Sequence, residues 1–294
     1  MNSVYLIESS TLTGIASAIR SKTGTSSAFT PAQMITEIDN IVTGGGGDVS
    51  PHKYKNSTIT SYTGSEVYIL YDAFRDCSAL TTVSFPECNY LADNAFTGCT
   101  ALTTALFPEC SYIGNYAFYT CSALTTVSFP LCSYIGNNAF YYCTALTSIS
   151  FPQCSYIGAG AFSGCTALTT VSIPKCSYIG NNAFQNCIAL TTASFPECSY
   201  ISGQAFRNCL RLTTVSIPKC SDYIGSSAFA GCTALTSLYL NGVSSVPTLA
   251  NSNAFTSTPL SAGGSGKIYV PKSLYATFQT ATNWSTLSAR FVSM

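Results

Sequence analysis

The chain has 294 residues, of which 47% are hydrophobic, enough to form a large core. Only 8% are charged, with 12 acidic residues balancing 12 basic ones, so the sequence lacks the basic surface of a nucleic-acid-binding protein. No apolar run is long enough to cross a membrane, and the first 20 residues lack the basic start and unbroken apolar stretch of a signal peptide.

Residues 1–43 are predicted to form a two-helix module for docking or oligomerisation. Apolar residues recur at helical spacing: Leu12, Ile15 and Ile19 in the first segment, and Met34, Ile35, Ile38 and Ile41 in the second. Thr30 can cap the second helix, with Pro31 at its first position and Gln33 completing a capping box. Two such short helices bury too little surface to be stable alone. They either pack on each other and on Val4 to Ile7, or dock onto another copy or another protein; we favour docking.

The amino-acid sequence of this first segment resembles that of a known module. Leu12-Thr13-Gly14-Ile15-Ala16 and Lys22-Thr23-Gly24 are similar to a short N-terminal module of virion- and tail-associated proteins of phages and prophages. This resemblance implies that residues 1–43 attach the chain to other virion proteins. Residues 44–57 follow as a glycine-rich linker, in which Gly44 to Gly47 form a flexible joint.

A 22-residue repeat recurs from about residue 67 to residue 240 and, with a degenerate unit before it, predicts a solenoid over residues 58–240. One phenylalanine column keeps this step, with one inserted residue: Phe74, Phe96, Phe118, Phe140, Phe162, Phe184, Phe206 and Phe229. All 15 cysteines fall into two further columns, one represented by Cys143 and the other by Cys154. A single repeat cannot offset its own backbone ordering, so stacking must stabilise the array.

The repeat also identifies a family resemblance. In LTSISFPQCSYI, the residues Leu146, Ile149, Phe151, Cys154 and Ile157 occupy the fixed places of a leucine-rich repeat. The motifs AF-x-x-C-x-x-L and I/F-P-x-C-x-x-I resemble those of BspA-like leucine-rich repeat proteins over roughly residues 67 to 255. This resemblance implies an α/β repeat: a right-handed leucine-rich-repeat solenoid with a parallel β-sheet on one side, a small N-terminal helical module and a C-terminal cap. It implies binding more than catalysis.

Each unit is predicted to have a strand half and a return half. In LTTVSFP, Val127 and Phe129 point inward while Thr126 and Ser128 point outward, and a glycine such as Gly136 permits a sharp turn in the return half. Cysteines in both columns are expected to be buried, reduced thiols. Equivalent residues of stacked strands lie ~4.8 Å apart, a spacing that a disulfide can bridge, so cross-links between neighbouring units remain an alternative.

Residues 241–294 are predicted to be a degenerate repeat followed by a C-terminal cap. Asn253 to Phe255 echo the repeat, Lys267 to Val270 form a strand, and Trp284 covers the end of the solenoid. Pro271 opens a helix whose Leu274, Tyr275 and Phe278 face the same end. The words IYVP and ATNW resemble the terminal segment of BspA-like proteins.

The sequence shows no catalytic motif. Its one histidine, His52, lies in the flexible approach to the repeats, where a hydrolytic triad could not be preorganised. Nucleotide-binding and zinc-protease motifs are absent, and the cysteines lack the short C-x-x-C pairs of zinc sites. We therefore expect no enzyme activity, no metal and no cofactor.

Binding information must lie where the repeats differ. One candidate group is aromatic and occupies two adjacent repeats: Tyr116, Tyr119, Tyr141 and Tyr142. Tyr119 and Tyr141 share a column, so we expect their rings to stack as neighbours. The other candidates vary in charge at the position after proline: Glu109, Lys175, Glu197 and Lys219. Alternatively, the tyrosines merely cover the turn below; the regular tyrosine column that includes Tyr134 and Tyr156 is expected to be structural.

Three functions are compatible with this pattern. The first is a phage virion-associated protein, of the tail or fibre, that recognises a protein or glycan on a host cell surface and assembles as a homo-oligomer through residues 1–43. The second is a bacterial cell-surface or extracellular adhesin of the BspA-like kind. The third is a virion decoration or spacer protein without a receptor.

Overall fold

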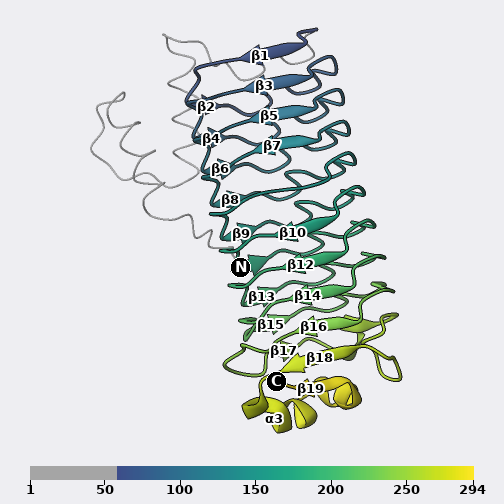
Figure 1. Cartoon of the computed structure of the whole chain (residues 1–294). Helices are drawn as coiled ribbons and strands as arrows, with labels where there is room; N and C mark the ends of the chain where they lie inside the picture. Colours follow the sequence, from purple (N-terminus) through teal and green to yellow (C-terminus); the bar gives the residue numbers. More distant parts are fainter. Residues whose placement is uncertain (1–57) are drawn as a thin grey trace, which may run out of the picture.

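The computed structural model describes residues 58–294, which form one stack of coils closed at its C-terminal end (Figure 1). Each regular coil contains a longer and a shorter strand. The longer strands are β1 (Ser61–Thr63), β3 (Thr82–Ser84), β5 (Thr104–Leu106), β7 (Thr126–Ser128), β10 (Thr170–Ser172), β12 (Thr192–Ser194), β14 (Thr214–Ser216), β16 (Ser237–Tyr239), β18 (Lys267–Val270) and β19 (Phe291–Ser293). The shorter strands are β2 (Tyr68–Ile69), β4 (Tyr90–Leu91), β6 (Tyr112–Ile113), β8 (Tyr134–Ile135), β9 (Tyr156–Ile157), β11 (Tyr178–Ile179), β13 (Tyr200–Ile201), β15 (Tyr223–Ile224) and β17 (Thr248–Leu249). The predicted two-helix module and linker lie outside the described residues.

Neighbouring coils pair in parallel, in the register of the sequence repeat. Tyr134 lies opposite Tyr156, and Ile135 opposite Ile157, an offset of 22 residues. The shorter strands form one nine-stranded sheet. The longer strands form a four-stranded sheet, β1-β3-β5-β7, and a six-stranded sheet, β10-β12-β14-β16-β18-β19. The predicted leucine-rich-repeat solenoid with a parallel sheet is confirmed, and the sheet of shorter strands is added to it.

The longer-strand side is interrupted at one coil, between β7 and β10 (Figure 1). Residues 147–150 of that coil form no strand. Inside the interruption, the Phe129 and Phe151 ring centroids are 5.9 Å apart, against 5.0 Å for Phe107 and Phe129 one coil earlier. The other phenylalanine column keeps its spacing there, with 5.2 Å between Phe140 and Phe162. The stack therefore opens on the longer-strand side only.

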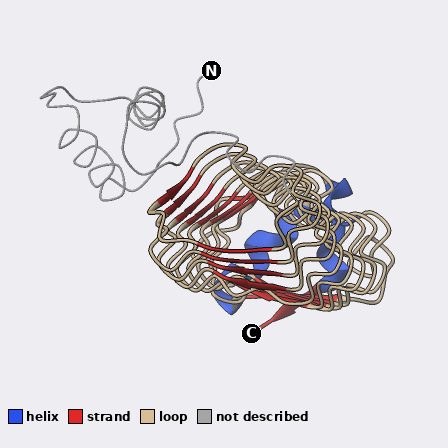
Figure 2. Cartoon of the chain, turned by 90° about the horizontal axis from the view of Figure 1, so that it is seen from above, coloured by secondary structure: helices blue, strands red, loops and turns tan. Residues whose placement is uncertain are grey.

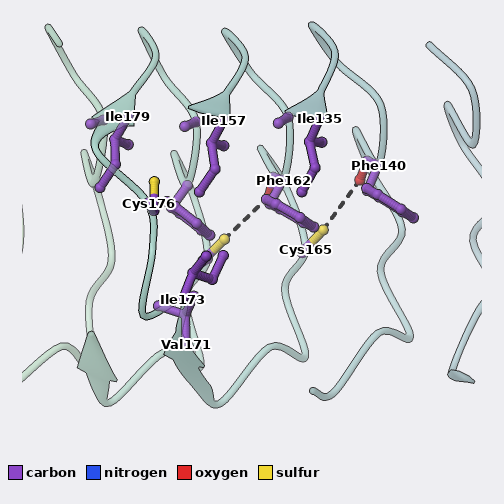
Figure 3. Close-up of a cluster of buried hydrophobic side chains, with 14 of the residues drawn as sticks. Ile135, Phe140, Ile157, Phe162, Cys165, Val171, Ile173, Cys176 and Ile179 are labelled. Carbon is purple, nitrogen blue, oxygen red and sulfur yellow. Dashed lines mark hydrogen bonds between the residues drawn. The ribbon is translucent and has the colours of Figure 1, made fainter. Parts of the chain in front are cut away.

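The core is a set of columns in which each side chain packs on its own copies. Phe140 and Phe162 are stacked with 2° between their ring planes, and isoleucines such as Ile157 line the shorter-strand side (Figure 3). These residues are fully buried. Because every column needs the coil above and below, stability comes from stacking, as the sequence predicts.

All fifteen cysteines are free and buried in this structure, which confirms that both columns are buried ladders. Cys165 Sγ donates a hydrogen bond of 3.2 Å to the carbonyl oxygen of Phe140 in the preceding coil (Figure 3). That oxygen already accepts the N–H of Cys143, so the thiol occupies its second acceptor site. In the other column, Cys154 Sγ donates to the carbonyl oxygen of Tyr156 at 3.2 Å. Burial raises the pKa of Cys154 and of Cys165 to about 12, which keeps both protonated at neutral pH.

A turn follows the glycine column, as predicted, but the glycine serves close packing between coils rather than a left-handed turn conformation. Gly136 does not have a positive φ. A Cβ at this position would lie 2.6 Å from the carbonyl carbon of Gly114 and 2.7 Å from the nitrogen of Asn115. Adjacent backbones approach so closely here that a side chain would push the coils apart.

A C-terminal cap covers the end of the stack, as predicted. It contains η1 (Ser252–Phe255), η2 (Lys272–Leu274), α3 (Tyr275–Thr280) and η3 (Trp284–Arg290). Seen from above, these helical turns lie within the outline of the superposed coils (Figure 2). Phe255 continues the phenylalanine column by stacking on Phe229 at 5.6 Å. Trp284 is 1% exposed, packs against Phe278 and donates its indole N–H to the carbonyl oxygen of Pro247 at 2.8 Å.

Candidate binding surface

The variable part of each coil lies between its shorter strand and the next longer strand. We call this segment the return arm; it comprises residues 114–123 and the equivalent residues of the other coils. From β1 to β16, outward positions of the longer strands are threonine or serine almost throughout, with Leu106 and Tyr239 as exceptions. The return arm therefore carries most of what distinguishes one coil from the next.

Two backbone positions in each return arm have a left-handed φ. The first precedes Ala-Phe and is occupied by Asp72, Asn94, Tyr116, Asn138, Gly160, Asn182, Gln204 and Ser227. The second precedes cysteine and is occupied by Asp76, Gly98, Thr120, Tyr142, Gly164, Asn186, Asn208 and Gly231. Most of these are asparagine, aspartate or glycine, the types that tolerate this conformation.

Five residues depart from this rule, among them Gln204 and Ser227, which lie in other arms. The three departures with aromatic or β-branched side chains all lie in two adjacent arms. They are Tyr116 at φ 56°, Thr120 at φ 58° and Tyr142 at φ 56°. A non-glycine residue in a sparsely populated backbone region costs about 1–3 kcal/mol. Since asparagine or glycine meets the same geometry elsewhere in this chain, local stability does not explain these side chains. Their concentration makes the two arms the candidate binding site.

The same arms carry a continuous aromatic group, which we call the tyrosine cluster: Tyr116, Tyr119, Tyr141 and Tyr142. Tyr116 meets Tyr119 edge to face, with ring centroids 5.6 Å apart. Tyr119 stacks on Tyr141 at 5.0 Å and 2°, which confirms the predicted neighbour pair. Tyr141 contacts Tyr142 at 4.6 Å with 52° between the ring planes. Tyr116 and Tyr142, the two ends of the cluster, are 41% and 44% exposed.

The next arm provides a seat for Tyr142. A Cβ on Gly164 would lie 3.0 Å from Cδ2 of Tyr142 and 3.1 Å from both Cε2 and Cγ. Ser163, in the column of Tyr141, is also small and is buried. The small residues of this arm thus leave room for the ring of Tyr142 to lie over the backbone.

The cluster is electrically neutral. Burial raises the pKa of Tyr141, and the neighbouring Tyr142 and Tyr119 raise it further, so the phenol keeps its proton at neutral pH. Across the four arms 92–101, 114–123, 136–145 and 158–167, the one charged residue is Asp93. Its carboxylate accepts hydrogen bonds from the backbone N–H of Asn115 at 2.7 Å and from the Asn115 amide at 3.0 Å. The surface therefore offers aromatic faces, hydroxyls and amides.

The charged candidates lie elsewhere in the coil. Glu109, Lys175, Glu197 and Lys219 follow proline at the turn from the longer to the shorter strand, and all are exposed. Lys219 pairs with Glu197 of the preceding coil at 2.7 Å, and Lys175 donates to the side-chain oxygen of Gln153. Exposed pairs of this kind contribute at most about 1 kcal/mol. The structure does not bring these charges together with the tyrosine cluster.

The regular tyrosine column runs along the sheet of shorter strands and has another geometry. Tyr134 and Tyr156 stack at 4.8 Å, and Tyr156 and Tyr178 at 4.9 Å, with nearly parallel rings. Each ring covers the faces of its neighbours, as expected of a structural ladder. These tyrosines present fewer free aromatic faces than Tyr142 does.

Sequence reasoning missed two residues of the site, Thr120 and Gly164. Both belong to the column before cysteine, where asparagine, aspartate and glycine predominate. That composition is the signal of a left-handed backbone position. With it, Thr120 and Tyr142 could have been recognised as exceptions from the sequence alone.

The part of the chain from residue 58 to residue 294 holds no group of three or more His, Cys, Asp or Glu residues able to bind a metal ion. Nor does it contain a helix long and apolar enough to cross a membrane.

Stacked parallel coils of 22 residues with fixed leucine, phenylalanine and cysteine columns define a leucine-rich-repeat solenoid. The chain belongs to the family of the BspA type leucine rich repeat region, whose profile matches residues 49–168 and 133–261. No curated protein matches the sequence significantly.

Several solved structures resemble the chain in fold. A leucine-rich repeat protein of T. pallidum is 22% identical, covering 65% of this chain and 73% of its own, with a TM-score of 0.38. A leucine rich cell surface protein of Faecalibacterium prausnitzii is 20% identical, covering 82% and 80%, with a TM-score of 0.39. The pneumococcal vaccine antigen PcpA is 15% identical, covering 80% and 77%, with a TM-score of 0.35.

Proposed function

We propose that this chain is a non-catalytic recognition protein that contacts its target through the tyrosine cluster. The observation that carries the proposal is the coincidence of strain and aromatic exposure. Tyr116 and Tyr142 hold a left-handed backbone where most other coils use asparagine, aspartate or glycine, and they are also the most exposed tyrosines of the cluster. Binding of a target would explain why these side chains persist at a cost in stability.

Tyrosine suits this role for physical reasons. Its ring supplies a large contact area with few rotatable bonds, so little conformational entropy is lost on binding. In the cluster, ring contacts restrain that motion further, because Tyr119 and Tyr141 hold each other at 5.0 Å. The contact surface is thus organised before the target arrives.

Two settings for display follow from the sequence. The resemblance of residues 1–43 to a phage module supports attachment to a virion, with Leu12, Ile15, Ile19, Met34, Ile35, Ile38 and Ile41 forming the apolar contact to other virion proteins or other copies. Membership of the BspA type family supports display on a bacterial cell surface instead. Mass spectrometry of purified particles and of surface-shaved cells separates the two, because the chain should be found in one fraction and not in the other.

A decoration or spacer role without a receptor is the competing function. The two are separated by labelling the full chain and measuring its binding to a panel of intact bacterial and epithelial cells by flow cytometry. Recognition predicts saturable binding to some cells, lost when Tyr119, Tyr141 and Tyr142 are replaced by alanine. Tyr239→Ala is the matched control, since it removes a half-buried tyrosine from the sheet of longer strands. Equal binding by the triple variant would favour the spacer.

A further inference from the structure

We propose that the corner between Tyr141 and Tyr142 holds one neutral pyranose ring, with a C–H face of the sugar lying on the exposed face of Tyr142. This assignment rests on the proposed function, because it names the ligand of the same surface.

The ring of Tyr142 lies face down on the neighbouring coil. If Gly164 approached the ring at its edge, one ring atom would be much closer than the two beside it. Instead, the position of a Cβ on Gly164 is 3.0, 3.1 and 3.1 Å from the consecutive atoms Cδ2, Cε2 and Cγ. Gly164 is therefore beneath the face of the ring. The opposite face is turned to solvent, in agreement with the 44% exposure of Tyr142.

Tyr141 forms the wall of the corner. One of its faces is covered by Tyr119 at 5.0 Å, so its other face is directed toward the coil on which Tyr142 lies. In that coil, the residue in the column of Tyr141 is Ser163, which is too small to cover an aromatic ring. The two tyrosine rings meet at 52° with their centroids 4.6 Å apart. The ring of Tyr142 forms the floor of the corner and the ring of Tyr141 its wall. Each is one six-membered ring in size, so the corner matches a single sugar ring.

The chemistry around the corner suits a neutral saccharide. The face of an aromatic ring is the negative part of its quadrupole and attracts the weakly positive C–H bonds of a sugar face. Thr144 in the same arm and Thr166 in the next supply hydroxyl oxygens that can accept hydrogen bonds, since each hydroxyl already donates to a backbone carbonyl. Gln185 lies in the column of Tyr141 two coils on, ~10 Å away. A charged ligand would lose water without gaining an opposite charge, because Asp93 is already hydrogen-bonded to Asn115.

A protein partner fits less well. A stable protein interface covers about 800 Å² on each side and depends on buried aromatic and arginine residues. Beyond the four tyrosines, the exposed and half-buried residues of arms 114–123 and 136–145 are serine, threonine, asparagine and alanine. Serine and threonine are poor in binding hot spots.

Saturation-transfer difference NMR on the full chain tests the assignment. The probes are methyl β-glucopyranoside, methyl β-galactopyranoside and methyl N-acetyl-β-glucosaminide, with methyl β-glucuronide as the charged counterpart. We expect a Kd on the order of 1 mM for at least one neutral glycoside, with saturation strongest on the protons of one sugar face. The glucuronide should bind at least threefold more weakly.

Variants locate the site. Tyr142→Ala should weaken binding at least tenfold, whereas Tyr142→Phe, which keeps the ring in place, should stay within about twofold of the original chain. Tyr239→Ala should bind unchanged. Absence of saturation transfer to every neutral glycoside, or equal binding by Tyr142→Ala with its circular dichroism intact, would overturn the proposal.

Failure of this assignment is distinguishable from failure of the proposed function. If cell binding is lost in the Tyr119, Tyr141 and Tyr142 alanine variant but survives periodate oxidation of the cell-surface glycans, the saccharide is wrong and recognition by the cluster stands. If cell binding does not depend on the cluster, both proposals fall.

Discussion

Raising the pH above about 9 should unfold the solenoid cooperatively, because its thiols are buried as neutral groups. Burial raises the pKa of Cys154, Cys165 and Cys198 to about 12. The pKa is also raised for nine further cysteines: Cys99, Cys110, Cys121, Cys132, Cys143, Cys176, Cys187, Cys209 and Cys220. Burial is the largest cause for eight of them, whereas for Cys99 the hydrogen bond with Cys121 is the largest.

Proton linkage determines in which direction, and by how much, pH changes the stability of the solenoid. In the unfolded chain a thiol ionises near pH 8.5, whereas in the folded chain Cys154, Cys165 and Cys198 keep their protons to about pH 12 and the pKa of the other nine is also raised. The contribution is therefore fully present below pH 8.5 and is lost as the pH rises toward 12. Each thiol lowers the free energy of unfolding by roughly 1.4 kcal/mol per pH unit above 8.5. Even half of the ladder would remove on the order of 8 kcal/mol within one unit, comparable to the whole stability of a typical domain.

The assay is an equilibrium pH titration in a phosphine reductant, followed by far-ultraviolet circular dichroism and by the fluorescence of Trp284. We expect a steep transition between about pH 9 and 10, with thiolate absorbance appearing together with the loss of structure. Cys165→Ala should make the transition less steep by about one proton. The reasoning would be refuted if the thiols titrated near pH 9 while the circular dichroism remained native.

Three further changes test the packing and the backbone. The Tyr142→Gly variant should be more stable than Tyr142→Ala by about 1 kcal/mol, whereas Tyr141→Ala should be more stable than Tyr141→Gly, since only Tyr142 has a positive φ. Urea unfolding measures all four variants. Greater stability of the alanine variant at both positions would contradict backbone strain at Tyr142. Gly136→Ala should lower the free energy of unfolding by about 2–3 kcal/mol because its Cβ would lie 2.6 Å from Gly114. Ala92→Gly, in the same column, should lower it by less than about 1 kcal/mol. An unchanged free energy of unfolding in Gly136→Ala would show that the coils can separate. Phe140→Ala should lower the free energy of unfolding by about 3–5 kcal/mol by loss of a fully buried ring. Lys219→Ala should change the denaturation midpoint little, since its ion pair with Glu197 is exposed. Similar losses of stability in both variants would mean that stacking of the core columns does not dominate stability.

The repeat made most of the fold predictable, because each column packs on copies of itself. The inward phenylalanines, the buried thiols, the strand from Lys267 to Val270 and the role of Trp284 all follow from position within the unit. The helix after Pro271 is divided into η2 and α3, with Phe278 buried and Leu274 and Tyr275 partly buried.

Features that depend on the distance between coils were not predictable. The role of Gly136 became clear only from the approach of Gly114. The interruption at residues 147–150 has no local cause in sequence, since Ser237–Tyr239 also begins with serine and still forms β16. Within the site, the stacking of Tyr119 and Tyr141 followed from their shared column, whereas the seat of Tyr142 on Gly164 required the backbone conformation.

The most direct test of recognition by the tyrosine cluster is the binding of the full chain to intact cells, compared with the Tyr119, Tyr141 and Tyr142 alanine variant. We predict saturable binding by the original chain and by Tyr239→Ala, and at least a tenfold loss in the triple variant with its circular dichroism preserved. Undiminished binding by a folded triple variant would contradict the assignment of this surface.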